Sequence, residues 1–241
     1  MCIRDSVETL REMLDGKIDT LHFDEAWLPH ATFHDFYKNM HAIGKDRPRA
    51  KESMIFSTQS THKLLAGLSQ ASQVLVRESE SVKLDKDAFN EAYLMHTSTS
   101  PQYSIIASCD VAAAMMEAPG GTALVEESIL EALDFRRAMR KIDEEWGKDW
   151  WFKVWGPNEF VEEGIGSQED WIFSADSQEW HGFGKLAPGF NMLDPIKATI
   201  VNPGLSLDGQ FADSGIPASI VTKYLAEHLS LIHISEPTRP Y

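Results

Sequence analysis

The sequence is poor in basic residues and in cysteine. Its 241 residues contain 22 Lys and Arg against 37 Asp and Glu, a formal net charge of −15, so we expect no basic surface of the kind that binds nucleic acid. The two cysteines, Cys2 and Cys109, are too few for a disulfide framework and favour a reducing compartment, the cytoplasm. No apolar run reaches the length of about 18 residues that spans a membrane, and no signal-peptide pattern is present. We therefore expect neither a nucleic-acid nor a membrane partner.

Several common catalytic and metal-binding motifs are missing too. Gly120–Gly121 lacks the preceding strand and the spacing of a phosphate-binding loop, and no Gly-x-Ser-x-Gly nucleophile elbow occurs. His30 and His34 stand four residues apart, as in some zinc sites, but no third ligand accompanies them, so we expect no metal. Cys109 lies in an apolar segment without a partner cysteine, which indicates a core residue.

The two ends of the chain look foreign to the protein. The first six residues read MCIRDS and the last thirteen read LSLIHISEPTRPY. These segments match translations of opposite strands of one sequencing-adaptor oligonucleotide, and such scars are excluded before the fold is considered. We therefore predict that residues 1–6 and 229–241 are adaptor-derived and that residues 7–228 are an internal fragment of a longer reading frame.

Between these ends, strand-like and helix-like segments alternate, which indicates an α/β fold. The expected strands are residues 20–23, 53–59, 73–77, 151–155, 171–173 and 198–201, and the first is expected to be buried. Helices are expected at residues 87–95, 103–116, 122–146 and 217–228. The segment 103–116 is apolar nearly all round, which predicts a buried helix.

The helix at 122–146 has the clearest pattern, with Thr122 as its expected N-cap. Its apolar residues recur at steps of three and four, which predicts one buried stripe formed by Val125, Ile129, Ala132, Phe135, Met139, Ile142 and Trp146.

Two residues stand out as chemical candidates. Lys63 follows an apolar strand and precedes Leu64 and Leu65, where a desolvated amine with a lowered pKa could form a Schiff base. A lysine whose stem lies along an apolar surface is the alternative. Asp24 leaves the first strand, and ligands of open α/β sheets bind at the carboxyl ends of strands. An acid in a turn or a helix cap is the alternative there.

At Lys63 the sequence becomes recognisable. It resembles the inducible bacterial arginine, lysine and ornithine decarboxylases, which use pyridoxal phosphate and have the aspartate-aminotransferase type fold (fold type I). The blocks that carry the resemblance are HFDEAW (22–27), STHKLLAGLSQAS (60–72), FNEAYLMHTSTSP (89–101), EWHGF (179–183), LDPIK (193–197) and GIPASIV (215–221). The resemblance implies that residues 7–216 are the C-terminal part of a cofactor-binding major domain with a mixed, mostly parallel sheet flanked by helices. Residues 217–228 would begin the connection to a C-terminal domain.

The resemblance assigns roles to four residues near the cofactor ring. Lys63 matches the family's Schiff-base lysine, and Asp24 matches the acid that pairs with the pyridine nitrogen. An ionised Asp24 keeps that nitrogen protonated, so that the ring can accept electrons when the carboxylate leaves. Ala26 and Trp27 match residues that line one side of the ring and the substrate entry.

Four further residues match family positions. Ser60 and His62 match residues near the cofactor phosphate and the lysine, and His62 is taken with Lys63 as a catalytic candidate. Ser98 matches a hydroxyl that reaches the phosphate of a neighbouring subunit, which implies a homodimer or higher homo-oligomer. His181, in the EWHGF block, matches a family motif without an assigned chemical step.

The implied reaction is decarboxylation of a basic amino acid, arginine or lysine and possibly ornithine. Two alternatives stay open: another reaction on the same fold, such as aminotransfer or aldol cleavage, and an inactive decarboxylase-like binding or regulatory subunit. The family's phosphate-binding loop and much of its substrate pocket lie outside the matched segment. We therefore expect this chain alone to be inactive.

Overall fold

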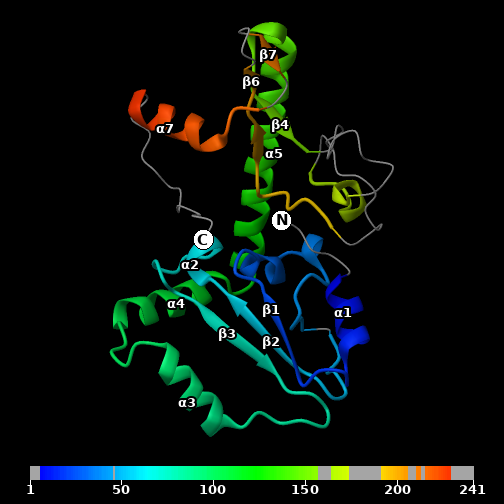
Figure 1. The fold of residues 1–241 in the computed structure, drawn as a ribbon, viewed down its shortest axis with the longest axis vertical. Helices are drawn as coiled ribbons and strands as arrows, with labels where there is room; N and C mark the ends of the chain where they lie inside the picture. The colour runs from blue at the N-terminus through cyan, green and yellow to red at the C-terminus, as the bar shows by residue number, and fades with distance from the viewer. Residues whose placement is uncertain are drawn as a thin grey trace.

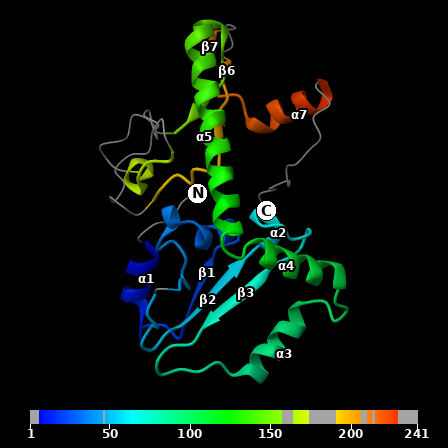
Figure 2. The same ribbon diagram turned by 180° about the vertical axis from the view of Figure 1, so that it is seen from behind.

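The computed structural model describes residues 6–45, 47–156, 164–173, 191–205, 210–212 and 215–228. Figures 1 and 2 show a small sheet with α1 at one side and α3 and α4 at the other, and a long helix, α5, that rises away from it. The elements are α1 (Ser6–Leu14), β1 (Thr20–Asp24), η1 (Pro29–Phe33), η2 (Asp35–Tyr37), β2 (Met54–Gln59), α2 (Thr61–Leu64), β3 (Gln73–Arg77), α3 (Lys86–His96), α4 (Tyr103–Met115), α5 (Gly120–Trp146), η3 (Gly147–Asp149), β4 (Lys153–Trp155), η4 (Gln168–Trp171), β5 (Thr199–Val201), β6 (Gly204–Leu205), β7 (Phe211–Ala212) and α7 (Ala218–His228).

The main sheet has the strand order β1-β2-β3. Strands β1 and β2 are parallel, with Asp24 opposite Thr58, and β2 and β3 are antiparallel. The α/β class and the mixed sheet are confirmed, but the expectation of a mostly parallel sheet is wrong for the described strands, since β4–β5 and β6–β7 are antiparallel as well. The physical reason at β3 is its connection to β2, which holds only the single turn α2. That turn reverses the chain instead of carrying it back along the sheet.

The expectation that the first strand is buried is also wrong. Residues of β1 alternate between exposed and half-buried. Among the described residues β1 pairs with β2 alone, so its other edge has no strand beside it. A strand is buried on both faces only when other elements cover them.

The core lies where the first half of α5 packs on η1, η2 and the segment that ends at Leu193. Val125, Ile129 and Leu133 of α5 are buried there, together with Tyr37 and Trp171. The predicted stripe is therefore confirmed at Val125 and Ile129, is half-buried at Ala132, Met139 and Ile142, and is wrong at Phe135 and Trp146. Phe135 is 40% exposed because the buried face of α5 runs on through Leu133 and Arg136, and Trp146, the last residue of the helix, is 61% exposed.

Smaller predictions about helix and strand ends also change. Thr122 does not cap α5, because its hydroxyl donates to the Phe33 carbonyl while Pro119 occupies the N-cap position. Strand β4 begins only at Lys153. Trp171 ends the 3₁₀ turn η4, and the strand predicted at 171–173 is reduced to a single antiparallel bridge between Ile172 and Met192.

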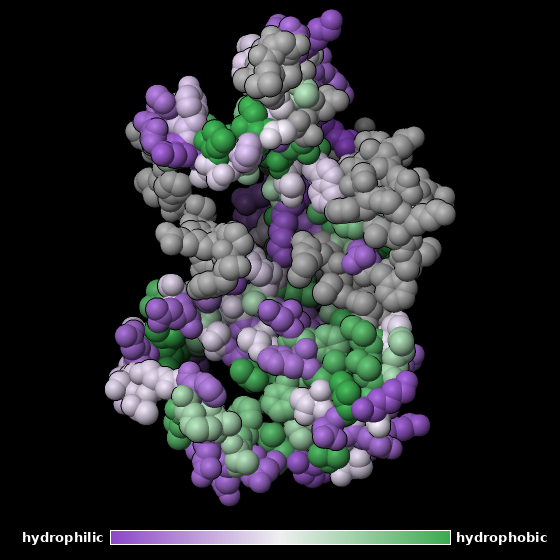
Figure 3. Space-filling view, viewed as in Figure 1, coloured by the Kyte–Doolittle hydropathy of each residue, from purple (hydrophilic) through white to green (hydrophobic). Residues whose placement is uncertain are grey.

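Helix α4 is apolar but not buried. Of its residues only Ala112 is fully buried, while Tyr103, Ile106 and Val111 are 80%, 53% and 56% exposed. Hydrophobic surface appears over the lower part of the molecule in Figure 3, where α1, α3 and α4 lie in Figure 1. The prediction of a buried helix is wrong here because nothing in the described chain covers this face. Among the described helices none is both long and apolar enough to cross a membrane.

One residue in the buried stripe of α5 is a cation. The guanidinium of Arg136 is fully buried, and it donates to the carbonyls of Pro195 and Lys197, the latter at 2.8 Å. Burial lowers its pKa to about 10, against the opposing effect of the Asp194 carboxylate. Arg136 therefore ties the segment 194–197 to α5 by bonds that are shielded from water.

We predict that Arg136→Leu lowers the free energy of unfolding by about 3 kcal/mol, because it leaves the buried carbonyls of Pro195 and Lys197 without their donor. Urea unfolding followed by circular dichroism measures this. Arg137→Leu is the matched control: Arg137 is the next residue on α5 and pairs with the exposed Asp134, so its loss should cost less than about 0.5 kcal/mol. Equal losses from the two variants would contradict the assignment.

Candidate active site at the carboxyl ends of two parallel strands

The chain makes a tight turn where β1 ends. The carboxylate of Asp24, the last residue of the strand, accepts from the backbone nitrogen of Ala26 at 3.0 Å. The backbone nitrogen of Glu25, between these two residues, donates to the Thr58 carbonyl of β2 at 2.9 Å. This Asx-type turn carries the chain directly into Trp27. The DEAW block therefore lies at the carboxyl edge of the parallel pair, as predicted for Asp24.

Glu25 was missed by the sequence reasoning. Its carboxylate is buried, with an exposed fraction of 6%, and accepts from the Ser57 hydroxyl at 2.6 Å, the Gln59 amide at 3.0 Å and the Ala42 backbone nitrogen at 2.6 Å. Neighbouring side chains of an extended chain point to opposite sides. Asp24 and Glu25 are consecutive, so one of the two side chains has to face inward. This alternation was the signal in the sequence that could have identified Glu25.

The lysine block begins one residue after β2 ends. Ser60 occupies the N-cap position of α2 and is buried, and no bond joins its hydroxyl to the helix. The His62 ring nitrogen Nδ1 donates to the Ala71 carbonyl at 2.9 Å, which fastens α2 to the start of β3. Lys63 is half-buried, and its ammonium lies 4.7 Å from the centre of the Trp27 ring. The two recognised blocks thus meet through Trp27.

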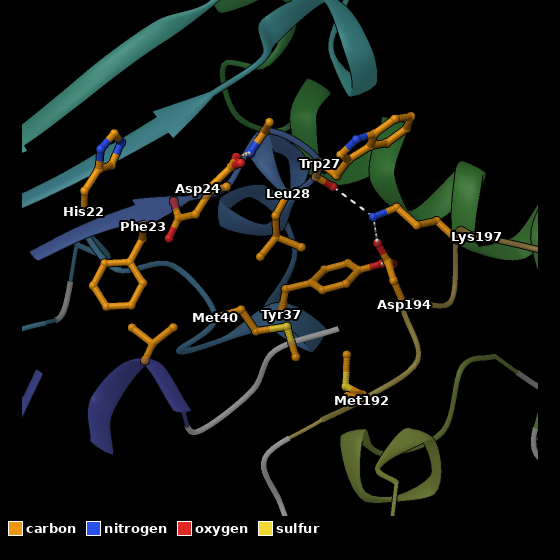
Figure 4. A pocket seen from close by; sticks show the side chains of 13 residues that line it. His22, Phe23, Asp24, Trp27, Leu28, Tyr37, Met40, Met192, Asp194 and Lys197 are labelled. Atoms are coloured by element: carbon orange, nitrogen blue, oxygen red, sulfur yellow. Dashed lines mark hydrogen bonds and ion pairs between the residues drawn. The ribbon is translucent and has the colours of Figure 1, made fainter. Parts of the chain in front are cut away.

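A cavity of about 600 Å³ opens beside the end of β1. Asp24, Ala26 and Trp27 are among its lining residues, and Figure 4 shows how the labelled side chains surround it. The residues of α2 are not among its lining residues, and Trp27, which lines it, is the residue that also lies close to Lys63.

A second lysine and a buried acid complete the site, and the sequence reasoning assigned neither. Lys197 Nζ donates to the Trp27 carbonyl at 3.0 Å and lies 3.1 Å from Asp194 Oδ2. Asp194 is buried and accepts from the Tyr37 hydroxyl at 2.7 Å. Both residues belong to the LDPIK block, which carried the resemblance but no role. The signal in the sequence that could have identified them is the placement of Asp194 and Lys197 on either side of the apolar pair Pro195–Ile196.

Asp194 is held as a carboxylate. Burial alone would raise its pKa, but His30, Lys197 and Tyr37 hold the pKa well below its usual range. His30 Nε2 lies 3.5 Å from the second oxygen, and its ring stands edge-on to Tyr37. His34 instead contacts Glu126 of α5. The two histidines that suggested a zinc spacing thus contact carboxylates on different segments.

Two residues singled out from the sequence lie elsewhere, and a third is not among the described residues. Ser98 is exposed in the loop between α3 and α4 and exchanges hydrogen bonds with Ser100, so the structure does not bring it to Lys63. His181 lies outside the described residues. Cys109 is a half-buried free thiol on α4, so the prediction of a core cysteine is only partly right.

Comparison with known proteins decides the family. The family model described as "Orn/Lys/Arg decarboxylase, major domain" matches residues 4–238. The chain belongs to this family. Among curated members it is 45% identical over 223 residues to lysine decarboxylase LdcA of Pseudomonas aeruginosa, covering 92% of the chain and 29% of LdcA. It is 38% identical over 235 residues to the biodegradative arginine decarboxylase of Escherichia coli K12, covering 90% of the chain and 31% of that enzyme.

Solved structures of family members share the fold. The structure of lysine decarboxylase A from Pseudomonas aeruginosa matches with a TM-score of 0.80 and 44% identity, over 94% of this chain and 30% of that one. The constitutive lysine decarboxylase of E. coli matches with a TM-score of 0.77 and 36% identity, over 97% of this chain and 31% of that one. The chain thus spans under a third of the length of these family members.

We predict that Asp194→Asn makes the stability of the chain less sensitive to acid. The pKa of this carboxyl is lower in the folded state than its value of about 3.9 in unfolded chains, so it stabilises the fold above about pH 4, and this contribution is lost as the pH falls through the folded pKa. The variant should lose about 3 kcal/mol at neutral pH. Its free energy of unfolding should then decline less steeply than wild type between about pH 4 and about pH 2.

Urea unfolding across this pH range measures the effect. Asp134→Asn, which removes an exposed acid of α5, is the control and should cost less than about 0.5 kcal/mol at neutral pH. Parallel pH profiles for wild type and Asp194→Asn would show that Asp194 is not a stabilising buried carboxylate.

Proposed function

We propose that this chain is the lysine-bearing part of a pyridoxal-phosphate-dependent decarboxylase that acts on lysine or arginine. The observation that carries the proposal is that the parallel pair β1–β2 brings the segments of Asp24 and Lys63 to the same edge, where the Lys63 ammonium lies 4.7 Å from the Trp27 ring centre. Family members named for lysine are 38–45% identical to the chain and the arginine enzyme is 38% identical, whereas those named for ornithine are 28% identical. Ornithine is therefore the least favoured of the three substrates.

The donor set suits the cofactor. Lys63 offers a half-buried primary amine, and Asp24 offers a carboxylate with one oxygen engaged by Ala26. When bound, pyridoxal phosphate would supply an aldehyde that captures amines and a ring that accepts the electrons released with carbon dioxide. Lys63 would hold the aldehyde carbon, and Asp24 would hold a proton on the ring nitrogen. Ala26 would contact the ring, while Ser60 and His62 would lie toward the phosphate.

The wider assignments belong to the same proposal. The fold is that of the type I pyridoxal-phosphate enzymes, and residues 7–216 are the later part of its major domain. The exposed apolar surface of α4 and the exposed Ser98 support assembly as a homodimer or higher homo-oligomer, because an apolar face of this kind is usually covered by a partner. A cytoplasmic location stays a prediction.

A chimera tests the activity. Residues 7–228 replace the matching segment of Pseudomonas aeruginosa LdcA, and the purified chimera is supplied with pyridoxal phosphate and lysine, arginine or ornithine. We expect amine and carbon dioxide from lysine or arginine. In the chimera Lys63→Ala should lower turnover by about 10³-fold or more, because no other side chain replaces a covalent anchor. Lys83→Ala, which removes an exposed lysine paired with Glu78, should leave turnover unchanged.

The products separate the alternatives. A keto acid in place of the amine would favour an aminotransferase, and a folded oligomeric chimera without any product would favour an inactive regulatory relative. Unchanged turnover in Lys63→Ala would overturn the anchor assignment. The 241-residue chain alone should neither turn over these amino acids nor hold the cofactor stably. A stable yellow, active preparation of the chain alone would contradict that expectation.

A further inference from the structure

Lys197 makes contacts that its position in the sequence does not explain. Its side chain is 25% exposed, yet its ammonium group contacts two acceptors, the Trp27 carbonyl at 3.0 Å and the Asp194 carboxylate at 3.1 Å. Figure 4 shows both contacts as dashed lines that bridge the end of β1 and the segment that carries Asp194. Lys197 thus joins two parts of the chain that are 170 residues apart.

The base of this side chain is rigid. The Lys197 backbone nitrogen donates to the Asp194 carbonyl at 3.0 Å, and its own carbonyl accepts from Arg136 of α5 at 2.8 Å. Arg136 also binds the carbonyl of Pro195. The Asp194 side chain is fixed in turn by the Tyr37 hydroxyl. Backbone and counterion are therefore both held by buried groups, so the ammonium has a defined position.

Trp27 needs such support. Its side chain is 51% exposed, so packing alone constrains it weakly. The Lys63 ammonium lies 4.7 Å and the Lys197 ammonium 5.7 Å from the centre of its ring, within the range of cation–π attraction. The two ammonium groups therefore contact the same indole, and the distance between them is at most about one Debye length, ~10 Å.

We infer that Lys197 is a positioning residue for Trp27. Bound to Asp194, it holds the Trp27 carbonyl and ring so that the indole lines the cavity and stays beside Lys63. The Asp194 carboxylate balances the charge of Lys197, so the Lys197 ammonium can lie close to the Lys63 ammonium. The importance of the Trp27 position for turnover rests on the proposed function, whereas the placement of Trp27 does not.

Fluorine NMR of the 241-residue chain labelled with 5-fluorotryptophan tests the inference. The chain has seven tryptophans, and Trp27→Phe and Trp171→Phe identify two of their resonances. Lys197→Met should shift and broaden the Trp27 resonance and leave that of the buried Trp171 unchanged. In Lys197→Met, acetylation of Lys63, followed by mass spectrometry, should be about fivefold faster than in wild type. This factor corresponds to the loss of one ordinary hydrogen bond.

Two conservative variants and one control sharpen the result. Lys197→Arg keeps charge and donors and should restore the wild-type resonance in large part. Lys197→Gln keeps a donor without the charge, should give an intermediate shift, and serves in place of Lys197→Met if that variant does not fold. Lys141→Met removes an exposed lysine of α5 paired with Glu145 and should change neither readout.

A Trp27 resonance and a Lys63 acetylation rate that match wild type in Lys197→Met would overturn the inference. So would equal shifts of Trp27 and Trp171, which would mean that Lys197 only stabilises the fold. Neither readout requires cofactor or turnover. A chimera that fails to decarboxylate would therefore count against the proposed function and leave the positioning role intact.

Discussion

The parallel pairing of β1 with β2 is the constraint on which the site depends. Its register sets Asp24 opposite Thr58, so the chain leaves both strands at the same edge, once into the turn that ends at Trp27 and once into α2. Buried Glu25 holds this register because its carboxylate binds Ser57 and Gln59 on the neighbouring strand. A slip of one residue would turn that carboxylate away from its donors. Two blocks more than thirty residues apart thus form one surface around Trp27.

A second, ionic constraint supports this edge from the other side. The carboxylate of Asp194 and the guanidinium of Arg136 are both buried, and between them they fix the segment that presents Lys197 to the Trp27 carbonyl. Charges removed from water are costly unless they are well paired. Removing one member of the cluster would leave another buried group unpaired, so its loss would disturb both the core and the geometry around Trp27.

The sequence predicts the local parts of this arrangement better than the distant ones. Strand β3 has the predicted bounds, and the place of Lys63 after β2 follows from a short apolar run and its neighbours. Periodicity carries no information about pairs such as Tyr37 and Asp194, which are 157 residues apart, so the buried ionic cluster was missed. Apolar pattern also overstates burial where no described element covers a face, as on α4.

We propose Lys63, beside Trp27 at this edge, as the amine that carries the cofactor. Borohydride reduction of the LdcA chimera in the presence of pyridoxal phosphate, followed by peptide mapping, tests it most directly. We expect a phosphopyridoxyl group on Lys63 as the dominant adduct. A dominant adduct on Lys197, the other ammonium at Trp27, or an even distribution over exposed lysines would contradict it.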